Sequence, residues 1–577
     1  MNQGEALALA QKKLGKLDKE EDMKNIEPLI RALEYMPLAI VQATAYILQK
    51  APRYSVQQYL EKFQQSDRKK ATLLDYEGGQ LRRDREAKNS IIITWQISFD
   101  HIRQTRPSAA DLLSLMSFCD RQGIPESLLR ASDEKEEVAS EPGRQQHGPA
   151  LDVFDSDKES TDDESQSNSS EDDQFENDIS ALRDYSFISI NEDRETFEMH
   201  NLVQLATRRW LEAKGQQEKW KSEFIYRLNA QLPNGEYENW EICRSLLPHT
   251  IAAAAQRPKD ELPLIEWTSI LYKAAWYLGE IGEGPEAQVM AENAMKYRIK
   301  IFGREHNKSL DVIEMLGSVK MLRGRWEVAE KLFVEVMKTR RTQLGADHPS
   351  TLTSMANLAS TFRNQGRWKD AEELEVQVIE TRKMKLGVDH PSMLTSMANL
   401  ASTFRNQGRW KDAEELFVQV MEMSKTKLGV DHPSMLTSMA NLALTFISQG
   451  QWKDAEELLV QVMERSKMKL GVDHPNTLTS MANLASTFWN QGRWKDAEEL
   501  EVQVIEMSKT KLGVEHPSTL ASMNNLAYTW YCLGRVSEAI EMMQICIRNQ
   551  QDKLGSDHSY TRSSVSTLDN WTQKASK

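Results

Sequence analysis

The chain has 577 residues, 40% of them hydrophobic and 27% charged, and its 86 acidic and 72 basic residues give a net charge of −14. This length exceeds what one core organises, so three or four units are expected. No apolar run is long enough to span a membrane, the first residues carry no secretory pattern, and four scattered cysteines form neither a disulfide framework nor a metal-ligand spacing. The composition predicts a cytoplasmic protein with no metal site and no membrane association.

The negative charge is concentrated in one stretch. Residues 131–180 hold 17 acidic and three basic residues, which equals the net charge of the whole chain, so the remainder is neutral overall. A nucleic-acid-binding surface needs clustered Lys and Arg side chains. The distribution therefore disfavours a nucleic-acid partner.

The N-terminal half, residues 1–107 and 108–215, is expected to be mainly helical. Residues 24–50 predict a helix that is interrupted near Pro37, with Leu33, Ile40 and Ala43 on its apolar faces. Further elements follow in the order helix, helix, strand, strand, helix, over 109–118, 126–129, 187–190, 196–199 and 200–213. Helices followed by a hairpin indicate a winged-helix-like unit in 108–215.

An acidic segment, residues 131–178, interrupts that unit. Its part from Asp152 to Asp178 is rich in Asp, Glu and Ser and poor in apolar residues, which predicts disorder. Four hydroxyl residues have an acidic residue three positions later, as acidophilic kinases prefer: Ser160, Thr161, Ser169 and Ser170. The default interpretation is a solvated insertion loop, and phosphorylation or docking as a regulatory tail is left open.

After a helical linker over residues 216–260, the chain repeats itself every 42 residues. Seven glycines and seven histidines keep this register: Gly303, Gly345, Gly387, Gly429, Gly471, Gly513, Gly555, His306, His348, His390, His432, His474, His516 and His558. Such a period indicates a solenoid in which each unit is one supersecondary element. We expect the repeats to fill 261–577, with a worn first unit, six regular units over 303–554 and a C-terminal capping helix.

Each unit predicts a helical hairpin. Pro349 opens the first helix of one unit, with Asp347 or Ser350 as its cap, and Gly366 ends it. The first helix has an apolar stripe at Met355, Leu358, Ala359 and Phe362, and the second at Ala371, Leu374, Val378 and Ile379. One hairpin cannot bury both stripes, so neighbours must stack. Each histidine is alone in its unit beside a helix start, which favours a structural role over metal binding.

These units resemble the tetratricopeptide repeat, in the 42-residue form of kinesin light chains. The resemblance is carried by Leu358, Ala359, Phe362, Gly366 and Ala371. The family's aromatic residue late in the second helix is Phe417 in one unit but Glu375 and Glu501 in others, where looser packing is expected. The resemblance implies a mainly α fold: a superhelical solenoid whose first helices line a concave groove.

The resemblance also implies a peptide-binding role for one asparagine of each first helix. The counterparts of the family's groove asparagine are Asn357, Asn399, Asn441, Asn483 and Asn525. In the family this side chain typically hydrogen-bonds the backbone of a bound peptide. We therefore expect a protein or peptide ligand in the groove.

Three further positions of the first helix vary between units that are otherwise almost copies. They fall at i, i+3 and i+4 on the face opposite the apolar stripe. The candidate recognition residues there are Ser360, Arg363, Asn364, Arg405, Leu444, Ile447, Trp489, Tyr528 and Tyr531. Our hypothesis is that the asparagines hold an extended peptide and these sites select it, with exposed Trp489, Tyr528 and Tyr531 as anchors. Free drift of exposed positions is the alternative.

Two short motifs of the N-terminal half resemble the NB-ARC module of NOD-like receptors. Residues 35–39 are similar to its Gly-Leu-Pro-Leu-Ala motif and residues 199–201 to its Met-His-Asp motif. In that family the proline lies against adenine and the histidine reaches an ADP phosphate, which implies such contacts for Pro37 and His200. The sequence contains no Gly-x-x-x-x-Gly-Lys-Ser/Thr loop, so NTP hydrolysis has no electrostatic basis. Packing roles for Pro37 and His200 are therefore favoured.

The leading functional interpretation is a non-enzymatic, protein-binding scaffold. It would be a remnant or fragment of an NB-ARC/tetratricopeptide receptor of a design common in fungi, with an ARC-like segment before the winged helix. ADP or ATP would bind only if a phosphate loop precedes this sequence, and no other cofactor is expected. A kinesin-light-chain-like cargo adaptor is the alternative, although residues 216–260 lack the heptads that it predicts. Ligand identity, self-association and completeness of the chain stay open.

Overall fold

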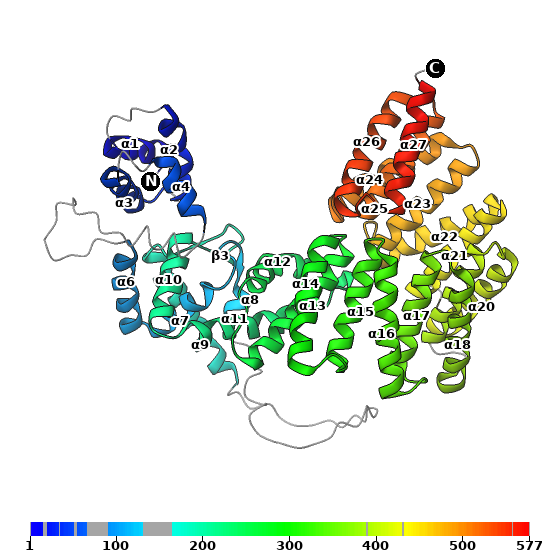
Figure 1. The fold of residues 1–577 in the computed structure, drawn as a ribbon, viewed down its shortest axis with the longest axis horizontal. Coiled ribbons are helices and arrows are strands. Elements are labelled where there is room, and N and C mark those ends of the chain that lie inside the picture. The colour runs from blue at the N-terminus through cyan, green and yellow to red at the C-terminus, as the bar shows by residue number, and fades with distance from the viewer. Residues whose placement is uncertain are drawn as a thin grey trace. The chain divides into compact units, whose positions relative to one another are not determined.

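The computed structural model describes residues 2–14, 20–33, 35–50, 55–65, 91–130, 164–387, 391–429, 432–556 and 558–575 (Figure 1). The chain forms two compact units. The first comprises Met1–Pro233 and Glu241–Ile270, and the second Asn234–Trp240 and Leu271–Lys577. No helix in the described part is both long and apolar enough to cross a bilayer.

The first unit begins with four helices around one apolar core. They are α1 (Gln3–Leu14), α2 (Glu20–Ala32), α3 (Pro37–Lys50) and α4 (Val56–Gln65). Ile30, Ile40 and Phe63 lie in this core together with Leu202 and Leu205 of the later helix α10 (Asn201–Ala213). The predicted interruption near Pro37 is confirmed, because Pro37 is the first residue of α3, where a missing N–H costs no helical hydrogen bond.

The predicted winged-helix-like elements are present. Along the chain they are α6 (Ile91–Thr105), α7 (Pro107–Met116), β1 (Ile124–Pro125), α8 (Glu126–Leu129), α9 (Glu164–Asp184), β2 (Ile188–Ile190), β3 (Thr196–Met199) and α10. The strands form an antiparallel sheet in the order β1-β3-β2, with Ile190 opposite Phe197. The hairpin and its flanking helices are therefore confirmed.

The prediction of disorder up to Asp178 is wrong for residues 164–178, which belong to α9. Three apolar residues at helical spacing explain the helix: Phe175 packs against the Phe197 ring, and Ile179 and Leu182 are buried. A prediction based on composition alone does not take this helical spacing of apolar residues into account. Residues 131–163, including Ser160 and Thr161, lie outside the described residues, and Ser169 and Ser170 lie in α9.

The predicted linker is divided between the two units. It forms α11 (Gln217–Gln231), the 3-10 turn η2 (Tyr237–Asn239) and α12 (Trp240–Ala254). His249 of α12 lies in the first unit, where its Nδ1 accepts a hydrogen bond from the Asp120 amide and its Nε2 donates to the Gly123 carbonyl. Burial lowers the pKa of His249, in keeping with a neutral ring that bridges these two backbone groups.

The second unit is a solenoid of helical hairpins, in each of which we name the first helix A and the second helix B. The first hairpin is formed by α13 (Glu261–Glu280), which belongs to this unit from Leu271 on, and α14 (Gly284–Phe302). The regular hairpins are α15 (Asn307–Leu322) with α16 (Trp326–Leu344), α17 (Pro349–Asn364) with α18 (Trp368–Leu386), α19 (Pro391–Asn406) with α20 (Trp410–Leu428), α21 (Pro433–Gln449) with α22 (Trp452–Leu470), α23 (Pro475–Asn490) with α24 (Trp494–Lys511), and α25 (Pro517–Cys532) with α26 (Val536–Lys553). Helix α27 (Ser559–Ala575) follows the last hairpin.

The repeated histidines are themselves the N-caps of the helices that follow them. The residues predicted as caps do not have this role. Among the described units, Nδ1 of the histidine accepts the backbone N–H two residues later, at 3.1–3.2 Å, in His306, His348, His432, His474, His516 and His558. His348, and not Asp347 or Ser350, therefore caps α17. A ring that accepts at Nδ1 is neutral and carries its proton on Nε2. The structural role expected for these histidines is thus confirmed, and it is N-capping.

Glu375 and Glu501 of helices B are buried, and the looser packing expected at these positions stays a prediction. Glu375 is 2% and Glu501 3% exposed, at the core position that Phe417 and Leu459 fill in other hairpins. Burial raises the pKa of each carboxyl to about 7, opposed in Glu375 by the Thr403 hydroxyl and the Arg363 charge and in Glu501 by the Thr529 hydroxyl. Each of these two units therefore contains a carboxyl group whose Oε2 is buried without a hydrogen-bond partner among the described residues.

Candidate protein-binding face of the repeats

The five predicted asparagines occupy the same half-buried position in successive helices A: Asn357, Asn399, Asn441, Asn483 and Asn525. Asn357 Nδ2 donates to Glu314 Oε1 of the preceding helix A at 3.0 Å. In this unit the amide already ties neighbouring hairpins together. A ligand that used it would have to share or replace that contact.

The variable positions of α17 and α19 present arginines. Arg363 donates to Glu375 Oε1 at 3.4 Å, to the Asn399 carbonyl at 3.2 Å and to Ser360 Oγ at 3.1 Å. Arg405 donates to the Asn441 carbonyl at 3.4 Å. Both arginines therefore bridge to the next helix A, and burial lowers the pKa of each, assisted in Arg405 by the charge of Arg363.

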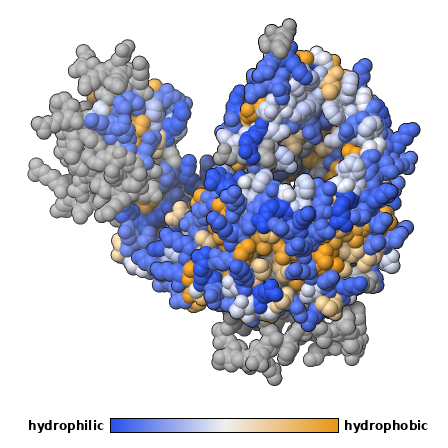
Figure 2. Space-filling view, turned by 45° about the vertical axis from the view of Figure 1, so that its right-hand side comes forward, coloured by the Kyte–Doolittle hydropathy of each residue, from blue (hydrophilic) through white to orange (hydrophobic). Residues whose placement is uncertain are grey.

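The same positions become apolar further along the array. Leu444 and Ile447 of α21 are half-buried, and Trp489 of α23 is 36% exposed. The face therefore changes from basic to apolar from one hairpin to the next. Hydrophobic side chains also appear in patches among hydrophilic ones on the surface of the repeats seen in Figure 2.

The expectation that Tyr528 and Tyr531 are exposed anchors is wrong. Both are half-buried beneath α27, where the Trp571 ring stacks on Tyr531 with centroids 4.5 Å apart and meets Tyr528 edge-on at 5.2 Å. The Tyr528 hydroxyl also hydrogen-bonds Thr567 at 2.6 Å. Their bulk serves the contact with the capping helix. The missed signal is Trp571 itself, which stands in register with a threonine, Thr361, of the regular units.

Sequence reasoning also missed that the two ends of the solenoid touch. His516 at the start of α25 donates from Nε2 to the Glu280 carbonyl at 3.2 Å, and Lys553 of α26 pairs with Glu283 at 2.6 Å. Gly282 lies so close to Pro517 that an added Cβ would be 2.4 Å from the proline Cδ. We call this contact between the first hairpin and the last ones the closure.

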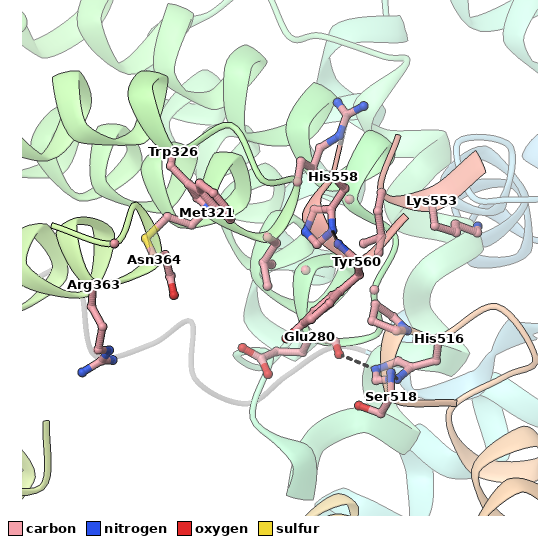
Figure 3. A pocket seen from close by; sticks show the side chains of 18 of the residues that line it. Glu280, Met321, Trp326, Arg363, Asn364, His516, Ser518, Lys553, His558 and Tyr560 are labelled. Atoms are coloured by element: carbon pink, nitrogen blue, oxygen red, sulfur yellow. Dashed lines mark hydrogen bonds between the residues drawn. The ribbon is translucent and has the colours of Figure 1, made fainter. Parts of the chain in front are cut away.

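A cavity of about 640 Å³, the closure cavity, lies beside the closure (Figure 3). Arg363, Asn364 and Asn406 line one side, so these positions of helices A face the interior of the superhelix. His516 and Tyr560 lie across from them (Figure 3). The cavity therefore joins positions on helices A to residues more than 100 positions away in the sequence.

The structure places the two residues matched to the NB-ARC motifs at the starts of helices. Pro37 is exposed at the start of α3, and His200 caps α10 by accepting the Leu202 N–H at 3.2 Å. His200 does line a cavity of about 670 Å³ with Arg121 and Arg183. The printed sequence, however, contains no Gly-x-x-x-x-Gly-Lys-Ser/Thr loop that could hold nucleotide phosphates. The described residues also contain no group of three His, Cys, Asp or Glu side chains that could hold a metal ion.

Comparisons with known proteins agree with the repeat architecture. Sequence profiles of the tetratricopeptide repeat match residues 309–384, 389–468, 434–510 and 519–560, and a domain of unknown function, DUF7779, matches residues 100–216. A nucleotide-binding leucine-rich repeat (NLR)-like protein of Hyaloscypha variabilis is 32% identical over 292 residues, half of this chain. The chain spans about a quarter of that relative's length.

Two solved structures are similar to parts of the chain. Nearly identical TPR-like repeats of a putative kinesin light chain from Podosopora anserina are 32% identical and cover 36% of this chain and 98% of theirs, with a TM-score of 0.31. A signal transduction ATPase with numerous domains and a tetratricopeptide repeat sensor, from Pyrococcus horikoshii, is 12% identical and covers 96% of this chain and 74% of its own, with a TM-score of 0.36.

Proposed function

We propose that this chain, an NLR-type tetratricopeptide-repeat protein, is a scaffold that recognises one peptide or protein ligand on the inner face of its helices A. One observation supports this most strongly. The segments 391–408 and 433–450 are identical except at three positions, where Ser402, Arg405 and Asn406 are replaced by Leu444, Ile447 and Ser448. All six side chains occupy the three variable positions of helix A, whose side we call the recognition face, and none belongs to the fully buried core. Change confined to these positions is the pattern that ligand selection produces.

A matched pair of tryptophans tests this proposal. Trp489 of helix A and Trp494 of helix B are 36% and 37% exposed. Peptides are selected from a display library on the full chain, and their affinities are measured by fluorescence anisotropy. Trp489→Ala should weaken binding at least about tenfold, because an exposed aromatic on an interface acts as an anchor. Trp494→Ala should leave affinity unchanged. Equal effects of the two changes would contradict the proposal.

The N-terminal unit is proposed to descend from an NB-ARC receptor and to act without nucleotide in this chain. Supporting this, the sequence Met199–Asn201 lies at the junction of β3 and α10 in a winged-helix-like fold, as the resemblance implies. We place this scaffold in the cytoplasm and assign it no catalytic activity. The adaptor alternative gains no support from α11 and α12, since each has 15 residues and α12 contains Pro248, so neither supplies a long coiled coil.

A further inference from the structure

The closure cavity interrupts a charge pattern that the rest of the solenoid repeats. In four successive junctions a glutamine at the end of helix A donates to a glutamate of the preceding helix B at 2.7–2.8 Å: Gln365–Glu330, Gln407–Glu372, Gln449–Glu414 and Gln491–Glu456. At most of these junctions an arginine two residues later pairs with the same glutamate, as Arg367 does with Glu330 at 3.0 Å. The regular junction is therefore balanced in charge.

At the first junction this pair is inverted. Arg323 stands in register with Gln365, and the neutral Gln288 stands in register with Glu330. Arg323 donates to Gln288 Oε1 at 2.5 Å, and its buried Nε has no hydrogen-bond partner among the described residues. It also makes no ion pair within the described part of the chain, and neither does Arg325, the counterpart of Arg367. Positive charge is thus left without an ion pair at the end of α15, where Arg323 lines the closure cavity.

The other walls of the closure cavity suit an anionic group joined to a flat apolar one. Its charged lining residues are Arg323, Arg363, Lys553 and Glu280, a formal excess of two positive charges. Lys553 is already paired with Glu283 and Glu515, and Arg363 with Glu375, so Arg323 is the cation that can accept a new partner. Trp326, Trp368 and Tyr560 supply aromatic surface. A volume of about 640 Å³ is in the range of small-ligand sites.

We propose that the closure cavity binds an aromatic carboxylate, with Arg323 as the carboxylate's partner and the tryptophans as the wall for its ring. The ligand is either a free aromatic acid or the C-terminal residue of a peptide. Bound there, it contacts hairpins from both ends of the superhelix and holds the closure together. This site goes beyond the recognition face of the helices A, because it depends on the first junction and on the last hairpins.

The test uses isothermal titration of the full chain with N-acetyl-tryptophan and with its amide, which lacks the carboxylate. The acid should bind and the amide should bind at least about tenfold more weakly, since a charge-assisted hydrogen bond is lost. Arg323→Gln introduces the side chain found at the regular junctions. It should lower the affinity for the acid by a similar factor and leave the affinity for the amide unchanged. Arg493→Gln, the same change at an arginine of a regular junction outside the cavity lining, is the control and should change neither.

Further measurements distinguish a free aromatic acid from a peptide C-terminus. They also separate this site from ligand binding on the recognition face. A tripeptide ending in tryptophan that binds more tightly than N-acetyl-tryptophan indicates a peptide terminus, and equal affinity indicates a free acid. Trp489→Ala should leave acid binding intact, so that failure of the recognition face and failure of this site are separable. No binding of the acid or the tripeptide, or acid binding that Arg323→Gln does not weaken, would overturn the proposal.

Discussion

Replacing Glu501 by leucine should stabilise the repeats by about 3 kcal/mol at pH 8 and by about 1 kcal/mol at pH 5, apart from any gain in apolar burial. The carboxyl group has an ordinary pKa of 4.5 and a folded-state pKa raised by burial to about 7. Because the folded chain holds this proton more tightly than the unfolded chain, the contribution of Glu501 to stability is most favourable below pH 4.5 and is lost as the pH rises through 7. Leucine does not ionise, so it removes this loss of stability at high pH. The equivalent position of another hairpin already carries a buried leucine, Leu459. Urea denaturation followed by circular dichroism at both pH values measures the difference.

Glu375→Leu is the matched comparison for this result. Its carboxyl is equally buried, but Arg363 lies 3.4 Å away, whereas position 489 of the Glu501 unit carries tryptophan. Removing Glu375 leaves the half-buried Arg363 without its carboxylate, so the stabilisation should be smaller than for Glu501→Leu. Equal gains in the two variants, or a Glu501→Leu gain that does not depend on pH, would show that ionisation of these buried groups does not limit stability.

Gly282→Ala should open the closure. Gly282 has φ +82°, which strains any L-residue, and the new Cβ would lie 2.4 Å from Pro517 Cδ. The backbone on both sides must then separate, and the His516–Glu280 and Lys553–Glu283 contacts should weaken with it. Hydrogen–deuterium exchange should accelerate in residues 278–284 and in the distant residues 516–520.

Gly450→Ala separates backbone strain from the closure contact. Gly450 has φ +79°, close to that of Gly282, but nothing lies within 4 Å of an added Cβ. This variant should accelerate exchange only near residue 450. If Gly282→Ala leaves residues 516–520 as protected as in the unchanged chain, the two ends of the superhelix are not coupled through this contact.

The sequence predicts the hairpins closely because each is specified locally. The apolar stripe and the glycine at the turn recur every 42 residues, a proline follows each register histidine from His348 to His516, and the helices A from α17 to α25 begin at those prolines. Closure depends instead on the small rotation between successive hairpins, summed over the array, and no single unit encodes that sum. The contact between Gly282 and Pro517 could therefore not be predicted from the sequence. The Arg323–Gln288 pair, in contrast, can be found by aligning the repeats.

The candidate site shows the same division between local and distant information. The helical period places the variable positions on one face, and the described units agree with it. Residues far away in the sequence determine which parts of that face are covered. Trp571 of α27, for example, packs on Tyr531 and partly buries it. In the acidic helix α9, local information was present but was overlooked. Phe175, Ile179 and Leu182 at helical spacing specify a helix despite the acidic composition.

The most direct test of ligand selection by the helices A is to transplant the three variable positions. The triple change Leu444→Ser, Ile447→Arg and Ser448→Asn makes residues 433–450 identical to residues 391–408. Because Ile447 packs half-buried against the core residues Ala443 and Leu459, the thermal midpoint should fall modestly, and affinities are compared at a temperature where both chains are folded. Peptides selected on the unchanged chain should lose at least about tenfold in affinity, and a new selection on the variant should yield a different consensus. Unchanged affinities and an unchanged consensus would contradict the account, and the three positions would then be drifting freely.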